Sequence, residues 1–140
     1  MNSPSYNYKL SHAVIEDNNI NTTGNSGIKV GGEDILIQRN ICKNCGWMGM
    51  FSGIQTHGND VRMIGNRLSN NGTSYMKYGI YIQSGSTNNY LADNIISAPS
   101  IAPIFDAGQN TIYKYALAIA RNDDGQFTVT SNSGPDYNVS

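Results

Sequence analysis

Two aspartates and one histidine stand where their side chains could do acid–base chemistry. Asp34 and Asp60 are 26 residues apart, and His57 comes three residues before Asp60. A carboxylate pair at a suitable separation can hydrolyse a glycosidic bond, and histidine titrates near neutral pH. His57, Asp60 and Asp34 are therefore the candidate catalytic residues. Aspartate is also an ordinary turn residue, and two stacked aspartates could equally hold a calcium ion or face water.

Four other side chains have the chemistry of a sugar-binding face. Lys29, Gln55 and Tyr81 each follow a Gly-Ile pair, and Gln83 comes two residues after Tyr81. Amides and a cation form hydrogen bonds with hydroxyl groups, and an aromatic ring stacks on the apolar side of a sugar. These four are the candidate substrate-binding residues. A solvated sheet face without a ligand would also be polar, and this alternative stays open.

The two cysteines form a C-x-x-C pair, Cys42 and Cys45. Such a pair is half of a zinc site or a redox pair. No second pair follows it, and neither His12 nor His57 stands at a ligand spacing from it. The sequence therefore predicts no metal site and no required cofactor, and favours structural cysteines over a metal or redox role.

The elements that must position these residues form an internal repeat. The segments "GIKV" (27–30), "GIQT" (53–56) and "GIYI" (79–82) begin 26 residues apart. A second pattern, apolar-x-x-Asn-x-apolar, recurs in step with them and contains Asn18, Asn40, Asn66 and Asn94. Apolar residues alternate within each short run, which is typical of strands and not of helices. The same turn residue in each cycle indicates a solenoid rather than a sandwich.

In a solenoid with three short strands per coil, equivalent residues stack above one another. We expect four inward columns: Ile28, Ile54 and Ile80; Val30, Thr56 and Ile82; Ile15, Ile37, Met63 and Leu91; Ile20, Cys42, Leu68 and Ile96. The four asparagines should form a hydrogen-bonded ladder at a corner, because a buried amide is stable only when it is paired. The repeated glycines are expected to meet a backbone requirement at a turn. Asp34 and Asp60 should stack on adjacent coils, about 4.8 Å apart.

The repeat "GIYIQSGSTNNYLADNII" (79–96) resembles the right-handed parallel β-helix of the pectate-lyase-like superfamily, and in particular the repeats of phage tailspike and tail-fibre proteins. The resemblance implies an all-β solenoid of about four to five coils over residues 1–110. It also implies a polysaccharide lying along the outer face of one sheet. The superfamily includes lyases, hydrolases and non-catalytic shafts, so the expected function is binding, with or without cleavage, of a surface or cell-wall polysaccharide. A structural shaft or trimerisation module is the alternative.

Composition and the remaining segments concern partners. A net charge of -1 with 14% charged residues gives no footprint for nucleic acid, and no apolar run is long enough for a membrane span. Residues 111–140 are expected to form two strands joined by an Asp124-Gly125 turn that cap or oligomerise the solenoid. Large apolar side chains on two inserted loops favour a subunit interface: Trp47, Met48, Met50, Phe51, Tyr75, Met76 and Tyr78. The tailspike resemblance implies a homotrimer on a virion surface or outside the cell.

Overall fold

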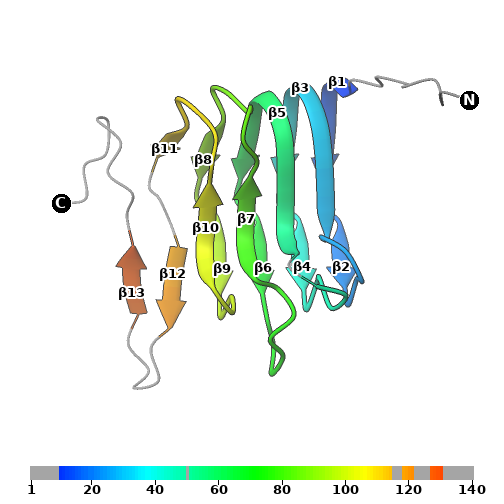
Figure 1. The fold of residues 1–140 in the computed structure, drawn as a ribbon, viewed down its shortest axis with the longest axis vertical. Helices are drawn as coiled ribbons and strands as arrows, with labels where there is room; N and C mark the ends of the chain where they lie inside the picture. Colours follow the sequence, from blue (N-terminus) through cyan, green and yellow to red (C-terminus); the bar gives the residue numbers. More distant parts are fainter. Residues whose placement is uncertain (1–9, 50, 115–117, 122–126, 131–140) are drawn as a thin grey trace, which may run out of the picture.

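The computed structural model describes residues 10–49, 51–114, 118–121 and 127–130, which form strands and turns (Figure 1). No helix long and apolar enough to cross a membrane occurs among these residues. The strands are β1 (Leu10–Glu16), β2 (Asn19–Asn21), β3 (Ile28–Gln38), β4 (Ile41–Lys43), β5 (Ser52–Ile64), β6 (Arg67–Ser69), β7 (Tyr78–Ile82), β8 (Tyr90–Ala92), β9 (Ile95–Ser97), β10 (Ala102–Asp106), β11 (Ile112–Lys114), β12 (Ala118–Arg121) and β13 (Phe127–Thr130).

Successive coils build two parallel sheets. The long sheet has the order β1-β3-β5-β7-β10, with β8 and β11 continuing it where the strands divide, and the short sheet has the order β2-β4-β6-β9. Each strand pairs in parallel with its equivalent in the next coil, and Figure 1 shows the coils side by side along the chain. The prediction of an all-β parallel β-helix is confirmed, with about four turns.

The predicted register is confirmed in all four inward columns. Ile28 pairs with Ile54 and Ile54 with Ile80. Thr56 joins the second column between Val30 and Ile82, and the third and fourth columns pair as expected on β1 to β8 and β2 to β9. Most members are buried and form the core between the two sheets. The apolar residues of the repeat therefore do fix which face of each strand points inward.

The expectation of three short strands per coil is wrong for the second and third coils. There the first two strands are fused into β3 and β5, which bend at Asp34 (φ 53°) and Asp60 (φ 54°). One residue with left-handed backbone changes the strand direction while the parallel hydrogen bonds continue on both sides. The fourth coil has two more residues at this corner, and its strand is divided into β7 and β8.

The repeated glycines are required for space and not for a turn, which corrects the expectation. Gly27, Gly53 and Gly79 are absent from the glycines with positive φ. A Cβ on Gly79 would lie 2.4 Å from Cγ2 of Ile96, and one on Gly53 would lie 3.1 Å from Cδ2 of Leu68. The first strand of each coil thus approaches the short sheet too closely for any side chain at this position.

The asparagine ladder is confirmed. The Asn40 amide donates to Oδ1 of Asn66 at 3.0 Å, and Asn66 donates in the same way to Asn94 at 3.0 Å. Each of these amides also donates to the backbone carbonyl of a residue one coil back, as Asn66 does to Ile37. Asn18 begins the ladder by donating to Asn40 at 2.9 Å. The ladder closes the corner between the long and short sheets with paired amides.

Parallel pairing continues further toward the C-terminus than the expected coil region, because β11 pairs with β8 up to Lys114. β12 and β13 then pair antiparallel, and β12 lies beside β9 at the end of the short sheet (Figure 1). The two predicted strands are therefore present, while the Asp124-Gly125 turn lies outside the described residues. The division at residue 110 and the capping role stay predictions.

The apolar side chains of the two inserted loops do not act as one group. Met76 is fully buried and belongs to the core, so its assignment to a subunit interface is wrong. Trp47, Met48 and Tyr75 are exposed, Phe51 and Tyr78 are half-buried, and Met50 lies outside the described residues. The exposed members leave the predicted interface in place as a prediction.

Candidate functional site

The two candidate aspartates lie in one pocket at the bend of the long sheet. Asp34 and Asp60 line it together with Arg62, Asn88 and Tyr90, and its volume is about 250 Å³. Arg62 of β5 and Tyr90 of β8 are register partners, which places them side by side just beyond the bend. The predicted juxtaposition of the two carboxylates on adjacent coils is therefore present, and we call this hollow the corner pocket.

A left-handed backbone residue occupies the bend in each coil. His12, Asp34, Asp60, Asn88 and Asn110 all have φ between 53° and 55°. Aspartate and asparagine tolerate this conformation because their short polar side chains form local hydrogen bonds. The fold thus accounts for Asp or Asn at this position without any chemistry. What the fold does not require is a carboxylate on two neighbouring coils.

Asp34 is held by two basic side chains. His12 Nδ1 lies 2.5 Å from Asp34 Oδ2, and Arg62 Nη2 donates to Asp34 Oδ1 at 3.5 Å. All three side chains are about half exposed or more, so these ion pairs stabilise the fold little. The contact leaves Nε2 of His12 free to exchange a proton, with the ring oriented by the carboxylate.

Asp60 differs from Asp34 in its surroundings. Its backbone N–H donates to the Thr87 carbonyl at 3.0 Å, whereas its carboxylate has no side-chain partner among the described residues. The pocket therefore pairs one engaged carboxylate with one free carboxylate, beside a guanidinium and a tyrosine. This set of groups can bind hydroxyls and move a proton.

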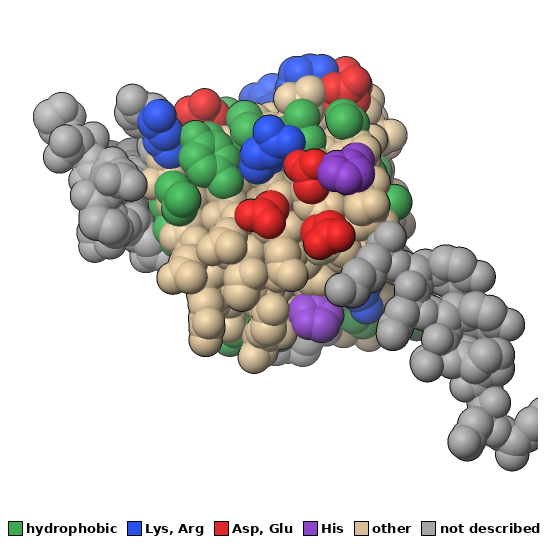
Figure 2. Space-filling view, turned by 90° about the horizontal axis from the view of Figure 1, so that it is seen from above, with side chains coloured by type: hydrophobic (Ala, Val, Ile, Leu, Met, Phe, Trp, Pro, Cys, Tyr) green, Lys and Arg blue, Asp and Glu red, His purple; other side chains and the backbone are tan. Residues whose placement is uncertain are grey.

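His57 is not a member of the corner pocket, which corrects the expectation that it lies beside the aspartates. Its exposed ring packs against the turn of the next coil, where a Cβ on Gly85 would lie 3.2 Å from Nε2. The reason is the bend, which turns Asp60 away from the strand that carries His57. Viewed from above, one histidine lies against acidic side chains, and the other lies apart toward an edge of the same face (Figure 2).

Sequence reasoning passed over His12 as a partner of Asp34. The signal was present, because His12 precedes Asp34 by 22 residues, the same step that separates Asn18 from Asn40. Applying that step to the aspartates would have placed a histidine in the same column. Arg62 and Tyr90 had no comparable signal, since they meet the pocket only through the bend.

The candidate binding residues lie on the outer face of the long sheet. Lys29, Gln55, Tyr81 and Phe105 are register partners in successive coils. Lys29 and Phe105 are exposed, Tyr81 is half-buried, and Gln55 is buried with its Oε1 accepting a hydrogen bond from Ser26 Oγ at 2.9 Å. Gln55 is thus less available to a ligand than its outward position suggested. Gln83 is half-buried, at the end of β7.

Three aromatic rings cluster at the C-terminal end of this face. The ring centroids of Tyr81 and Phe105 are 5.1 Å apart, and Tyr78 lies 5.8 Å from Tyr81 and 5.3 Å from Phe105. We call these three residues the aromatic cluster. Tilted and edge-on packing at these distances is favourable for rings and fixes their orientation. An exposed ring held in this way is a preformed stacking surface.

Cys42 and Cys45 are buried side by side, and both sulfurs would lie 2.9 Å from a Cβ placed on Gly27. Hydrogen bonding from Cys42, and from Thr23, lowers the pKa of Cys45 to about 6. The same bond to Cys45, together with burial, raises the pKa of Cys42. The part of the chain that the structure describes holds no group of three or more His, Cys, Asp or Glu able to bind a metal ion. Calcium takes about six to eight oxygen ligands, so a calcium role for Asp34 and Asp60 stays a prediction.

Comparison with known proteins bears on the fold. The sequence model of one family, described as "Right handed beta helix region", matches residues 3–96, which is more than half of the chain. No curated protein gives a significant match. No solved structure gives one either.

Proposed function

Because the chain belongs to the right-handed β-helix family, we propose that it is a carbohydrate-directed domain of the tailspike kind, within the pectate-lyase-like superfamily. It binds a surface or cell-wall polysaccharide along the outer face of the long sheet. Its place is a virion surface or the outside of a cell, where such polymers are found.

The aromatic cluster is the observation that carries this proposal. Phe105 is 42% exposed and is braced by Tyr81 and Tyr78, so it offers a rigid apolar surface to solvent. Lys29 lies further along the same column and supplies a hydrogen-bond donor. A sugar ring has an apolar side and a rim of hydroxyls, and this face matches both.

Any cleavage of the polymer would take place at the corner pocket. The pocket lies on the same long strands as the binding face, since Lys29 and Asp34 are both in β3 and Gln55 and Asp60 are both in β5. Five residues of strand extend roughly 16 Å, a distance that an extended oligosaccharide spans. Asp60 would act as the acid or base, in a lyase or a hydrolase, with His12 and Asp34 beside it.

A structural shaft is the second candidate function, and the exposed loop residues favour it. Trp47 is 55% exposed and Met48 is 69% exposed, on a loop that joins two coils. Large apolar side chains left in water are typical of a surface that another subunit covers. In this case the chain would form a homotrimer whose duty is rigidity.

A glycan array with the full chain and two variants tests the proposal. Wild-type protein should bind at least one class of polysaccharide, and Phe105→Ala and Tyr81→Ala should each weaken that binding about fivefold or more, because a stacking surface is lost. Tyr75→Ala, which removes an exposed tyrosine from a loop away from this face, is the matched control and should bind as wild type does. A folded wild-type protein that binds no glycan would contradict the proposal and favour the shaft.

A further inference from the structure

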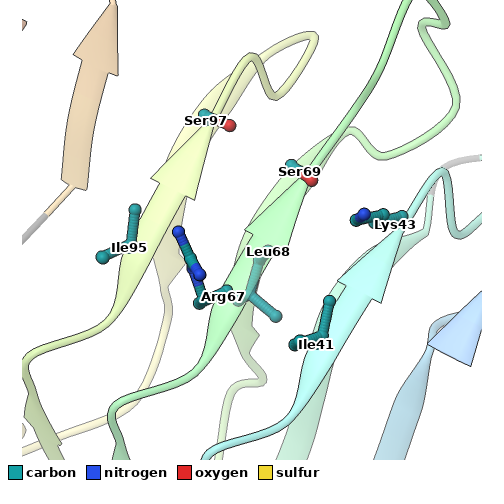
Figure 3. Close-up of a pocket in the computed structure, with 7 residues that line it drawn as sticks. All are labelled: Ile41, Lys43, Arg67, Leu68, Ser69, Ile95 and Ser97. Carbon is teal, nitrogen blue, oxygen red and sulfur yellow. The ribbon is translucent and has the colours of Figure 1, made fainter. Parts of the chain in front are cut away.

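The outer face of the short sheet carries a groove that the proposed function does not use. Its volume is about 250 Å³, and it crosses β4, β6 and β9. Figure 3 shows the residues that face it. They form two neighbouring columns: Ile41, Arg67 and Ile95 in one, and Lys43, Ser69 and Ser97 in the other. We call it the short-sheet groove.

Two cations dominate the short-sheet groove. Lys43 and Arg67 are exposed, and neither forms an ion pair with any described acidic side chain. No Asp or Glu lines the groove. In Figure 3 the Lys43 side chain extends from β4 toward Ser69, and Arg67 leans toward β9. Positive charge is thus concentrated here in a protein whose net charge is -1.

The remaining residues complete a site for a particular chemistry. The hydroxyls of Ser69 and Ser97 stand beside the cations as donors, and Ile41 and Ile95 provide an apolar floor on either side of Arg67. Arginine binds carboxylate and sulfate groups through two parallel hydrogen bonds, and lysine adds a point charge. Asn19 and Asn21 extend both columns onto β2 with further exposed amides.

We propose that the short-sheet groove is a second glycan subsite and that the polysaccharide it binds is acidic, bearing carboxylate or sulfate groups. A polymer running along the coils meets an equivalent pair of outward positions about every 4.8 Å. Its anionic groups lie against Lys43 and Arg67, and its apolar faces lie on the isoleucines. This inference rests on the proposed carbohydrate function and adds the charge of the ligand and a separate place for it.

Three dextrans with the same backbone test the charge requirement: dextran, carboxymethyl-dextran and dextran sulfate. Wild-type protein should bind one or both charged polymers at least tenfold more tightly than neutral dextran, and the polymer that binds better identifies the anionic group. Added salt should weaken this binding, since the cations are exposed and screened. Equal affinity for all three polymers would overturn the inference.

A double variant, Lys43→Gln/Arg67→Gln, tests the location. Its affinity for the charged dextran should fall at least tenfold, because charge-assisted hydrogen bonds are lost. Lys77→Gln/Lys114→Gln removes the same charge from elsewhere and should bind as wild type does. If both double variants weaken binding equally, the effect is net charge and the subsite is wrong. If the groove variant binds like wild type while Phe105→Ala binds less, the inference fails and the proposed function stands. If no polysaccharide of any kind binds, both fail.

Discussion

Asn66 donates a hydrogen bond from its side-chain amide to Oδ1 of Asn94 at 3.0 Å, and Oδ1 of Asn66 accepts from Asn40 at 3.0 Å. Both oxygens also accept a backbone N–H from the coil before. One buried amide therefore joins three coils, and the ladder transmits the register of each coil to the next.

Asn66→Ala should lower the free energy of unfolding by about 3 kcal/mol, because the buried amide of Asn40 and the carbonyl of Ile37 lose their partners. Asn18→Ala, at the partly exposed end of the ladder, should cost only about 1 kcal/mol. Chemical denaturation of both variants checks this. Equal losses would show that the ladder is not cooperative.

Gly79→Ala should destabilise the protein by about 1–3 kcal/mol, because its Cβ would lie 2.4 Å from Ile96 in a packed core. Gly49→Ala is the matched control, since its Cβ would meet Phe51 at an ordinary 3.5 Å. Thermal unfolding of the two variants measures the difference. A Gly79→Ala variant as stable as Gly49→Ala would contradict the close approach of the two sheets.

Asp60→Asn should leave stability almost unchanged, because Asn88 holds the same left-handed conformation at the equivalent position of the next coil. Asp60→Val should lose about 1–2 kcal/mol, since a branched side chain is strained at positive φ. Comparing the two separates backbone from chemistry. Should the protein cleave its polymer, Asp60→Asn is expected to abolish cleavage while retaining binding, and an active Asp60→Asn variant would exclude Asp60 as acid or base.

Cys45 should titrate well below an ordinary thiol, because its folded-state pKa is lowered to about 6 by hydrogen bonding from Cys42 and Thr23. Between pH 6 and its unfolded pKa of about 8.5, the folded state binds fewer protons than the unfolded state. This group therefore adds stability as pH rises through that window and loses it below pH 6. The raised pKa of Cys42 acts in the opposite sense above about pH 8.5.

Ultraviolet absorbance of the folded protein measures these titrations directly. One thiolate should appear near pH 6, and the second should stay protonated in the alkaline range. Cys45→Ser should remove the first titration together with its share of the rise in unfolding free energy between pH 6 and 8. Two thiols that titrate together near their ordinary pKa would contradict the hydrogen-bonded pair.

The proposed homotrimer predicts a mass in solution three times the 15.2 kDa of one chain. Replacing exposed Trp47 and Met48 together by serine should convert the trimer into a monomer with little change in the stability of each coil, because neither side chain belongs to the core. Light scattering measures the mass. A wild-type monomer would count against the interface, and a serine variant that stays trimeric would place the interface elsewhere.

The sequence by itself determined the strand register, the four inward columns and the asparagine ladder. Parallel stacking repeats the same environment in each coil, so equivalent positions need equivalent residues and the period is visible in the chain. Ile54 and Asn66 could be placed correctly for this reason. The stacking of Asp34 on Asp60 follows from the same period.

Only the tertiary structure decided which polar residues share a pocket. A single left-handed residue bends β5 at Asp60, and this bend separates His57 from the aspartates while it brings Arg62 and Tyr90 to them. The burial of Gln55 and the short-sheet groove likewise depend on side-chain packing between coils. A repeat specifies what lies above and below each residue, because the stacking is periodic. What lies around a corner depends on the angle of the bend, which no period in the sequence encodes.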